Sequence, residues 1–286
     1  MTFRPRRSVL YVPGNNTRAI EKAVSLPADV VLIDLEDAVP PQDKVIARRN
    51  AASAIRSEAF QDKELVIRIN GLDTEEAAED LVIACDADAV LVPKINGPDD
   101  IRRAEAGINQ LSSGDRPALW AMVETPKAVL NLAAIAAEAA EPGARLACLV
   151  LGTNDLAKDT RIQMTASRLA LLPWISQTIL SARAYDLVAL DGVFNGLKDP
   201  DGFAAECRQG RGLGFDGKTL IHPGQIAVAN QVFGPSEQEI AEARRIVEAF
   251  EQPENADKGV IVVGGKMVER LHLAMAQRVL AIAERI

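Results

Sequence analysis

The stretch Val30-Val31-Leu32-Ile33-Asp34-Leu35 is an apolar, β-branched run that leads directly into two acidic residues, Glu36 and Asp37. A run without polar alternation is typical of a parallel strand that is covered on both faces. Similar short runs recur at near-regular intervals, and each is followed by a polar turn and a helical pattern. The predicted strands are Ser8–Pro13, Val30–Leu35, Leu65–Ile69, Ala89–Val92, Ala118–Val123, Leu146–Leu151, Leu187–Leu190 and Lys218–Ile221.

Helical patterns separate these runs, and several begin with a proline or a capping residue. The predicted helices include Thr17–Ser25, Asp43–Arg56, Thr74–Ala84, Pro98–Leu111, Pro126–Ala140 and Arg168–Ala184. Eight alternations of strand and helix predict an α/β fold of the TIM (β/α)8 barrel type. The alternative is a doubly wound open sheet, which the eight units and the missing G-x-G-x-x-G motif after the first strand disfavour.

The end of the chain does not continue this repeat. We predict a barrel over residues 1–234 and a C-terminal arm over 235–286, with a helix at Ser236–Phe250, a short strand at Gly259–Gly265 and a final helix at Lys266–Ile286. The final helix carries an apolar stripe at helical spacing. The arm is therefore expected to pack on the outer wall of the barrel or on a neighbouring subunit.

The chain of 286 residues carries 32 basic and 40 acidic side chains, which gives a formal charge of −8. This excess argues against a general nucleic-acid-binding protein, which needs a basic face. Aromatic residues make up only 4%, which disfavours a stacking platform for single strands. An anionic ligand must therefore meet a local basic patch, and the candidate cations near the first strand are Arg4, Arg6, Arg7, Arg18 and Lys22.

The three cysteines, Cys85, Cys148 and Cys207, are scattered, which disfavours both a disulfide framework and a zinc knuckle. The basic N-terminus is not followed by the apolar segment of a signal peptide. No apolar stretch is long enough to cross a membrane. These features predict a soluble, cytoplasmic protein.

The active site of such a barrel lies at the C-terminal ends of its strands. Glu124 and Asp155 follow neighbouring predicted strands, and two carboxylates with water and substrate oxygens suit Mg²⁺. The alternative is that each acid caps the helix that follows it. His222 and His272 are the only histidines, so a zinc site is disfavoured.

Arg68 ends another predicted strand, where its guanidinium is well shaped to grip a carboxylate with two hydrogen bonds. The alternative is an internal salt bridge to Glu36 or Asp37, and these acids could also orient the arginine. The turn at residues 13–16 offers backbone N–H groups at the start of a helix, which favours an anion.

A series of short motifs in this order resembles the citrate lyase β-subunit-like (CitE-like) and malyl-CoA lyase branch of the HpcH/HpaI aldolase/citrate lyase family. The resemblance covers nearly the whole chain. The motifs are Arg7-Ser8-Val9-Leu10-Tyr11-Val12-Pro13-Gly14-Asn15, Leu32-Ile33-Asp34-Leu35-Glu36-Asp37-Ala38-Val39, Arg68-Ile69-Asn70, Val92-Pro93-Lys94, Glu124-Thr125, Leu151-Gly152-Thr153-Asn154-Asp155-Leu156, Ile221-His222-Pro223 and Gly265-Lys266-Met267-Val268-Glu269.

The resemblance implies a Mg²⁺-dependent acyl-CoA lyase, with Mn²⁺ as the alternative metal, that makes or cleaves the C–C bond between an acetyl-CoA-type enolate and a small 2-oxo acid. It also implies a homotrimer or hexamer. Glu124 and Asp155 are the expected metal ligands, and Arg68, Glu269 and Asp37 the expected catalytic residues. Residues expected to bind the substrate or CoA are Arg68, Glu124, Pro13, Gly14, Asn15, Asn16, Arg18, Lys22, Ile221 and His222.

One position departs from the family pattern. Many members have an aspartate where this chain has Glu269, and they donate it into the site of a neighbouring subunit. The longer stem shifts the carboxylate, and a displacement of about 1 Å can be costly in catalysis. This change leaves a malyl-CoA-type thioesterase as an alternative. A separate alternative is a citrate lyase β-like subunit that acts on an acyl-carrier-bound thioester. A CoA-independent class II aldolase is disfavoured, because Asp34–Lys44 contains no histidine base.

Overall fold

The computed structural model describes residues 4–112, 114 and 117–286. The chain divides into two compact units, one formed by Arg6–Ala229 and the other built on Asn230–Ile286. No helix among the described residues is long and apolar enough to cross a membrane.

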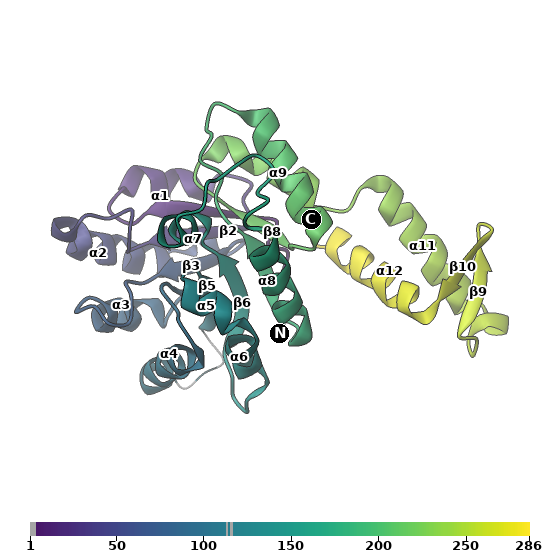
Figure 1. Cartoon of the computed structure of the whole chain (residues 1–286), viewed down its shortest axis with the longest axis horizontal. Helices are drawn as coiled ribbons and strands as arrows, with labels where there is room; N and C mark the ends of the chain where they lie inside the picture. Colours follow the sequence, from purple (N-terminus) through teal and green to yellow (C-terminus); the bar gives the residue numbers. More distant parts are fainter. Residues whose placement is uncertain (1–3, 113, 115–116) are drawn as a thin grey trace. The chain divides into compact units, whose positions relative to one another are not determined.

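The first unit is a closed barrel in which each parallel strand pairs with the next and β8 pairs with β1 (Figure 1). This topology confirms the predicted TIM barrel. Interior side chains such as Leu32, Leu91 and Trp120 fill the barrel, as is usual for this fold. The strands are β1 (Ser8–Pro13), β2 (Val30–Asp34), β3 (Glu64–Arg68), β4 (Ala89–Val92), β5 (Ala118–Val123), β6 (Leu146–Leu151), β7 (Val188–Asp191) and β8 (Gly217–Leu220).

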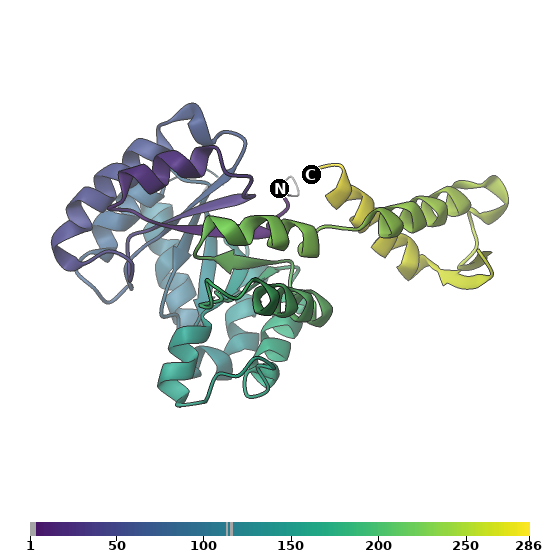
Figure 2. The same ribbon diagram turned by 90° about the horizontal axis from the view of Figure 1, so that it is seen from above.

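Helices surround these strands on the outside (Figure 2). The α-helices are α1 (Thr17–Val24), α2 (Lys44–Ile55), α3 (Ala77–Ala84), α4 (Pro98–Leu111), α5 (Pro126–Leu130), α6 (Leu132–Ala137), α7 (Thr153–Thr160), α8 (Leu172–Ala184), α9 (Pro200–Leu213) and α10 (Ile226–Phe233). Short 3₁₀ turns lie at Pro41–Asp43, Glu58–Phe60, Glu138–Ala140 and Pro223–Gln225.

The prediction of a single helix over Pro126–Ala140 is wrong in one respect. The helix breaks at Asn131, between α5 and α6. Asn131 leaves the helical conformation with φ −107° and ψ 8°. Its side-chain amide instead donates a hydrogen bond to the backbone carbonyl of Asn96. A short polar side chain that bonds backbone elsewhere competes with helix continuation.

The barrel closes through a buried cluster of charged side chains at β7 and β8. These strands pair at Leu190–Gly217 and Asp191–Lys218. Lys218 is fully buried, and its Nζ lies 3.2 Å from Oδ2 of Asp191 and 2.7 Å from Oε1 of Glu206. Nη1 of Arg168 donates to both carboxylate oxygens of Asp191 at 2.8 Å. Two cations and two carboxylates therefore balance one another inside the protein.

The second unit contains α11 (Glu237–Glu251), a 3₁₀ turn at Pro253–Asn255, β9 (Val260–Val263), β10 (Lys266–Glu269) and α12 (Arg270–Ala283). The helices α11 and α12 lie side by side, with the β9–β10 hairpin at one end (Figures 1 and 2). Phe250, Ile261 and Val268 form its small core.

The helix predicted from Lys266 onward is wrong over its first four residues, because Lys266–Glu269 pair with β9 as an antiparallel strand. The turn between the strands is Gly264-Gly265, with φ of 57° and 77°. Two consecutive residues with positive φ make the tight turn that suits a β-hairpin. The predicted strand at Gly259–Gly265 is thereby extended into a hairpin, and α12 begins after Glu269.

We expect Lys218→Met to lower the free energy of unfolding by about 3–5 kcal/mol, because it leaves Asp191 and Glu206 short of a buried cation. Urea unfolding followed by circular dichroism measures this loss. Lys158→Met is the matched control, since Lys158 is exposed on α7 and should change stability by less than about 0.5 kcal/mol. Equal stability of the two variants would contradict a structural role for the cluster.

Candidate active site

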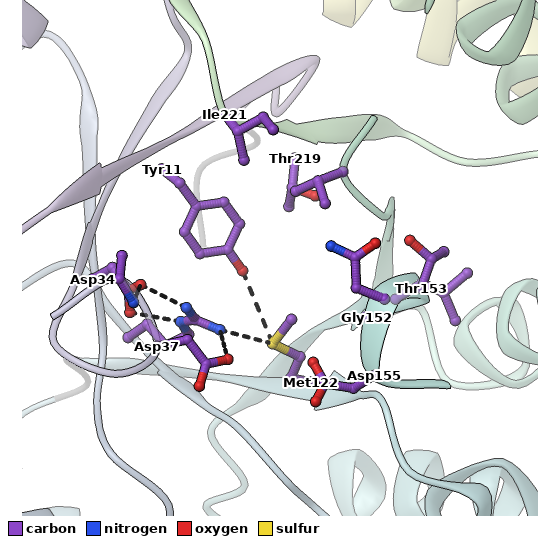
Figure 3. A pocket seen from close by; sticks show the side chains of 14 residues that line it. Tyr11, Asp34, Asp37, Met122, Gly152, Thr153, Asp155, Thr219 and Ile221 are labelled. Carbon is purple, nitrogen blue, oxygen red and sulfur yellow. Dashed lines mark hydrogen bonds and ion pairs between the residues drawn. The ribbon is translucent and has the colours of Figure 1, made fainter. Parts of the chain in front are cut away.

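A cavity of about 310 Å³ lies at the C-terminal ends of the barrel strands (Figure 3). It is lined by side chains that follow or end different strands, so residues far apart in sequence meet there. Polar and apolar groups share the lining, which suits a small organic anion. Its lining includes Tyr11, Asp34, Asp37, Arg68, Met122, Asn154, Asp155 and Ile221.

Arg68 is held at the cavity wall by Asp34, the residue opposite it in the register of β2 and β3. Nε and Nη2 of Arg68 donate to Oδ1 and Oδ2 of Asp34 at 2.7 and 2.6 Å. The same carboxylate oxygens accept from the backbone N–H groups of Glu36 and Ala38. The carboxylate that Arg68 grips in this structure is therefore Asp34. Arg68 can therefore donate to a ligand only through the N–H groups that do not bind Asp34.

The two acids expected to orient Arg68 both lie near its Nη1. Oε2 of Glu36 is 2.8 Å from Nη1, and Oδ2 of Asp37 is 3.7 Å away. The Glu36 contact is close but lacks hydrogen-bond geometry, and Oε2 of Glu36 has no hydrogen-bond partner among the described residues. Burial outweighs the attraction of Arg68 and raises the pKa of Glu36 to about 8. Asp37 is more than half exposed and is free to meet a ligand.

Tyr11 stacks beside the arginine, with the guanidinium carbon of Arg68 5.0 Å from its ring centroid. Its hydroxyl donates only to the weak acceptor Sδ of Met122, at 3.9 Å (Figure 3). Burial raises the pKa of Tyr11, so the group stays a neutral phenol near neutral pH. Tyr11 was not among the predicted site residues, because a tyrosine within an apolar strand is most often part of the core.

Glu124 and Asp155, the expected metal ligands, are brought together with Lys94 between them. The backbone N–H of Lys94 donates to Oε1 of Glu124 at 2.8 Å. Nζ of Lys94 lies 2.7 Å from Oδ1 of Asp155 and 3.4 Å from Oε1 of Glu124. Burial lowers the pKa of Lys94, but the hydrogen bond to Asp155 and the charge of Glu124 raise it above the ordinary value. Its ammonium therefore stays charged.

The remaining oxygen of Glu124 fits a metal ligand. Glu124 is fully buried, and its Oε2 has no hydrogen-bond partner in the described part of the chain, which is a costly arrangement unless a cation completes it. The described residues offer no group of three or more His, Cys, Asp or Glu side chains for a metal. Two carboxylates with water and substrate oxygens still match the usual Mg²⁺ site. The donor set thus fits Mg²⁺ or Mn²⁺ held partly by the substrate.

Gly152 allows this arrangement of carboxylates. A Cβ atom at residue 152 would lie 2.4 Å from Cβ of Glu124 and 2.9 Å from its Oε2. Any side chain there would displace Glu124, so the glycine lets the start of α7, which carries Asp155, approach the end of β5.

The turn at Pro13–Asn16 packs against the end of β2 and does not line the cavity. The N–H of Gly14 donates to the carbonyl of Asp34 at 2.8 Å. The side chain of Asn15 bonds Asp43, and that of Asn16 caps α1, the helix that carries Arg18 and Lys22. Neither Arg18 nor Lys22 reaches the cavity.

The two residues expected at the thioester end of the substrate differ in their placement. Ile221 lines the cavity, whereas His222 does not. Nδ1 of His222 instead accepts a hydrogen bond from the N–H of Gly224. Glu269 belongs to the second unit, where it ends β10 and caps α12. Its own N–H donates to Nδ1 of His272 at 3.0 Å.

Comparison with known proteins identifies the family of this chain. The profile of the family described as HpcH/HpaI aldolase/citrate lyase matches residues 7–223. A (3S)-malyl-CoA thioesterase of Cereibacter sphaeroides is 45% identical over 284 residues, which cover 99% of this chain and 96% of the relative. The citrate lyase subunit beta of Escherichia coli is 33% identical over 98% of this chain and 94% of its own.

Among solved structures, the protein CitE of Mycobacterium tuberculosis, in complex with magnesium, acetoacetate and coenzyme A, superposes with a TM-score of 0.78. It is 26% identical, and the match covers 99% of this chain and all of the other. The resemblance inferred from the sequence motifs is thereby confirmed.

We expect Glu36 to make stability depend on pH. Burial raises the pKa of Glu36 in the folded protein to about 8, whereas the ordinary pKa of a glutamate is 4.5. Unfolding therefore releases a proton between these values, and the stabilisation falls as pH rises from about 4.5 to about 8. Glu36→Gln keeps a neutral group at every pH. Its unfolding free energy relative to the wild type should therefore increase across this window in urea titrations.

The exposed Glu254→Gln serves as the control for this experiment and should differ from the wild type by the same small amount at each pH. A difference between Glu36→Gln and the wild type that stays constant from pH 4.5 to pH 8 would show that Glu36 is ionised in the folded protein.

Proposed function

Because the chain belongs to the HpcH/HpaI aldolase/citrate lyase family, we propose that it is a Mg²⁺-dependent enzyme that hydrolyses a malyl-CoA-type thioester. The observation that carries this proposal is the 45% identity to a (3S)-malyl-CoA thioesterase along nearly the whole of both chains. The reaction is cytoplasmic, since buried free thiols at Cys85, Cys148 and Cys207 suit a reducing compartment.

The residues that line the cavity, together with Glu124, which Lys94 links to Asp155, hold different parts of such a substrate. Glu124 and Asp155 hold the metal, with Mn²⁺ as an alternative to Mg²⁺. When bound, the metal polarises substrate oxygens and offsets negative charge that develops on them. The N–H groups of Arg68 that do not donate to Asp34 bind the free carboxylate of the malyl group. Asp37, at the same end of the cavity, is the exposed acid nearest to Arg68 and helps to position it.

In the hydrolysis, the oxygen of a water molecule bonds to the thioester carbonyl carbon, and the C–S bond then breaks. The water gives up one proton to a carboxylate base and the CoA sulfur leaves as a thiolate, which regains a proton to become the free thiol. We assign the base to Glu269. The CoA end runs along Ile221 and His222 toward the Pro13–Asn16 turn, where Arg18 and Lys22 supply positive charge to an otherwise acidic protein.

A second candidate is the C–C lyase reaction that the motifs suggested first, and the 33% identity to citrate lyase subunit beta favours it. In that reaction the hydroxyl proton of the substrate is removed, the bond to the carbon carrying that hydroxyl breaks, and the thioester survives. The two reactions use the same metal and carboxylate contacts, but they break different bonds.

Incubation of (3S)-malyl-CoA with the protein and Mg²⁺ distinguishes these reactions. We expect one free thiol, titrated with a disulfide reagent, for each substrate consumed. Lyase action would instead release glyoxylate, measured as its phenylhydrazone, and leave no free thiol. Stoichiometric glyoxylate would replace the thioesterase proposal by the lyase, and no turnover of malyl-, citramalyl- or citryl-CoA would refute both.

Glu124→Gln should lower the rate of malyl-CoA turnover by at least about a hundredfold, since changes outside the ligand shell of a metal already cost about 10- to 100-fold. The exposed Glu254→Gln is the matched control and should leave the rate unchanged. Wild-type activity in Glu124→Gln would remove this residue from the metal site.

We further propose that the protein is a homotrimer or hexamer in which the arm of one chain completes the site of another. The arm exposes large apolar side chains, among them Val262 at 74%, Met267 at 66% and Met275 at 63%. Exposed apolar groups of this size, close together in one small unit, are typical of an interface. Glu269, at the base of the hairpin, is the carboxylate that such an arrangement delivers.

Complementation between two inactive variants tests this assembly. Glu269→Gln lacks the arm carboxylate, and Arg68→Lys lacks the planar guanidinium on the barrel. Co-expressed in equal amounts, they should regain about a quarter of wild-type activity, because random assembly pairs an intact barrel with an intact arm at one site in four. No recovery above the separate variants would contradict a shared site.

A further inference from the structure

Lys94 occupies a strained position at the rim of the barrel. It lies two residues after the end of β4 and has φ of 54°, in the left-handed region that glycine adopts easily and other residues rarely. Such strain is kept only where the surroundings require it. Here the conformation aims the backbone N–H of Lys94 at Oε1 of Glu124.

The side chain of Lys94 turns to the same carboxylates as its backbone. The ammonium contacts Asp155 at 2.7 Å and Glu124 at 3.4 Å. One residue therefore holds one proposed metal ligand by its main chain and joins both ligands by its charge. Arg68, a cation in the lining of the cavity, is paired with Asp34 instead.

The charges of these groups define what else the site accepts. With both carboxyls ionised, Glu124 and Asp155 contribute −2 and Lys94 contributes +1, so the group carries −1 before a metal binds. A divalent cation brings the sum to +1, and one further carboxylate brings it to zero. The ammonium already holds Oδ1 of Asp155, while Oε2 of Glu124 has no hydrogen-bond partner among the described residues.

We propose that the positive charge of Lys94 makes metal binding depend on the substrate, an inference that rests on the proposed function. We call this role of Lys94 a counter-charge. Its ammonium weakens the site for a free divalent cation, and the carboxylate of an anionic substrate offsets that repulsion. Metal and acid then bind cooperatively, because each supplies the charge that the other lacks.

Calorimetric titration of Mg²⁺ into the full-length protein tests this inference without measuring turnover. Lys94→Met removes the ammonium, so the Kd of Mg²⁺ should fall at least about tenfold, given the size of a unit-charge repulsion at this range. (S)-malate, the acid that the proposed hydrolysis would release, should tighten Mg²⁺ binding to the wild type by about tenfold or more, and clearly less in Lys94→Met.

Three further variants separate charge from backbone. Lys94→Gly also removes the ammonium but relaxes the left-handed conformation, so it should match Lys94→Met in metal affinity and should be at least as stable in thermal unfolding. Lys94→Arg keeps the charge and should keep weak binding. Lys158→Met removes an exposed cation from the same helix as Asp155 and should leave the Kd unchanged.

The outcomes distinguish this inference from the proposed function. Mg²⁺ binding in Lys94→Met that equals or is weaker than binding in the wild type overturns the counter-charge role and leaves the metal site standing. Tighter binding in Lys94→Gly alone also overturns it, since the backbone is then the cause. Absence of Mg²⁺ binding in the wild type and in every variant, with and without malate, overturns the metal site as well.

Discussion

The register between β2 and β3 is the constraint on which the site depends, because it sets Asp34 opposite Arg68 at the rim of the barrel. Parallel strands in a closed barrel all end on the same side, so a polar residue at each strand end reaches a common space. The carboxylate of Asp34 accepts hydrogen bonds from two guanidinium nitrogens of Arg68 and from the backbone of the following loop. The arginine is therefore fixed before any ligand arrives, which lowers the ordering cost of binding.

The sequence predicted the barrel well because its evidence is local. Each strand is a short apolar run bounded by polar turns, and the observed bounds differ from the predicted ones by at most one residue. The β9–β10 hairpin was harder to predict, because Lys266–Glu269 also fits the start of a helix and only pairing with Val260–Val263 decides the matter. The break at Asn131 depends likewise on a distant partner, the carbonyl of Asn96.

The candidate site was predicted only in part, for a related reason. A residue at a strand end can be recognised from sequence, and Glu124, Asp155 and Arg68 were found in this way. The partner that each one takes depends on neighbouring strands. Asp34 proved to be the main partner of Arg68, where Glu36 and Asp37 were expected. The contribution of Lys94 depends on a positive φ and two contacts across strands, neither of which is written in its own segment.

The charged cluster that joins β7 and β8 also affects how the barrel responds to heat. Removing ions from water costs less as temperature rises, since the hydration of charged groups becomes less favourable. The backbone pairing at this seam is short, so the side chains of Arg168, Asp191, Glu206 and Lys218 carry much of the closure. The seam with the shortest strand ladder is thus held by side-chain contacts whose desolvation costs less on warming.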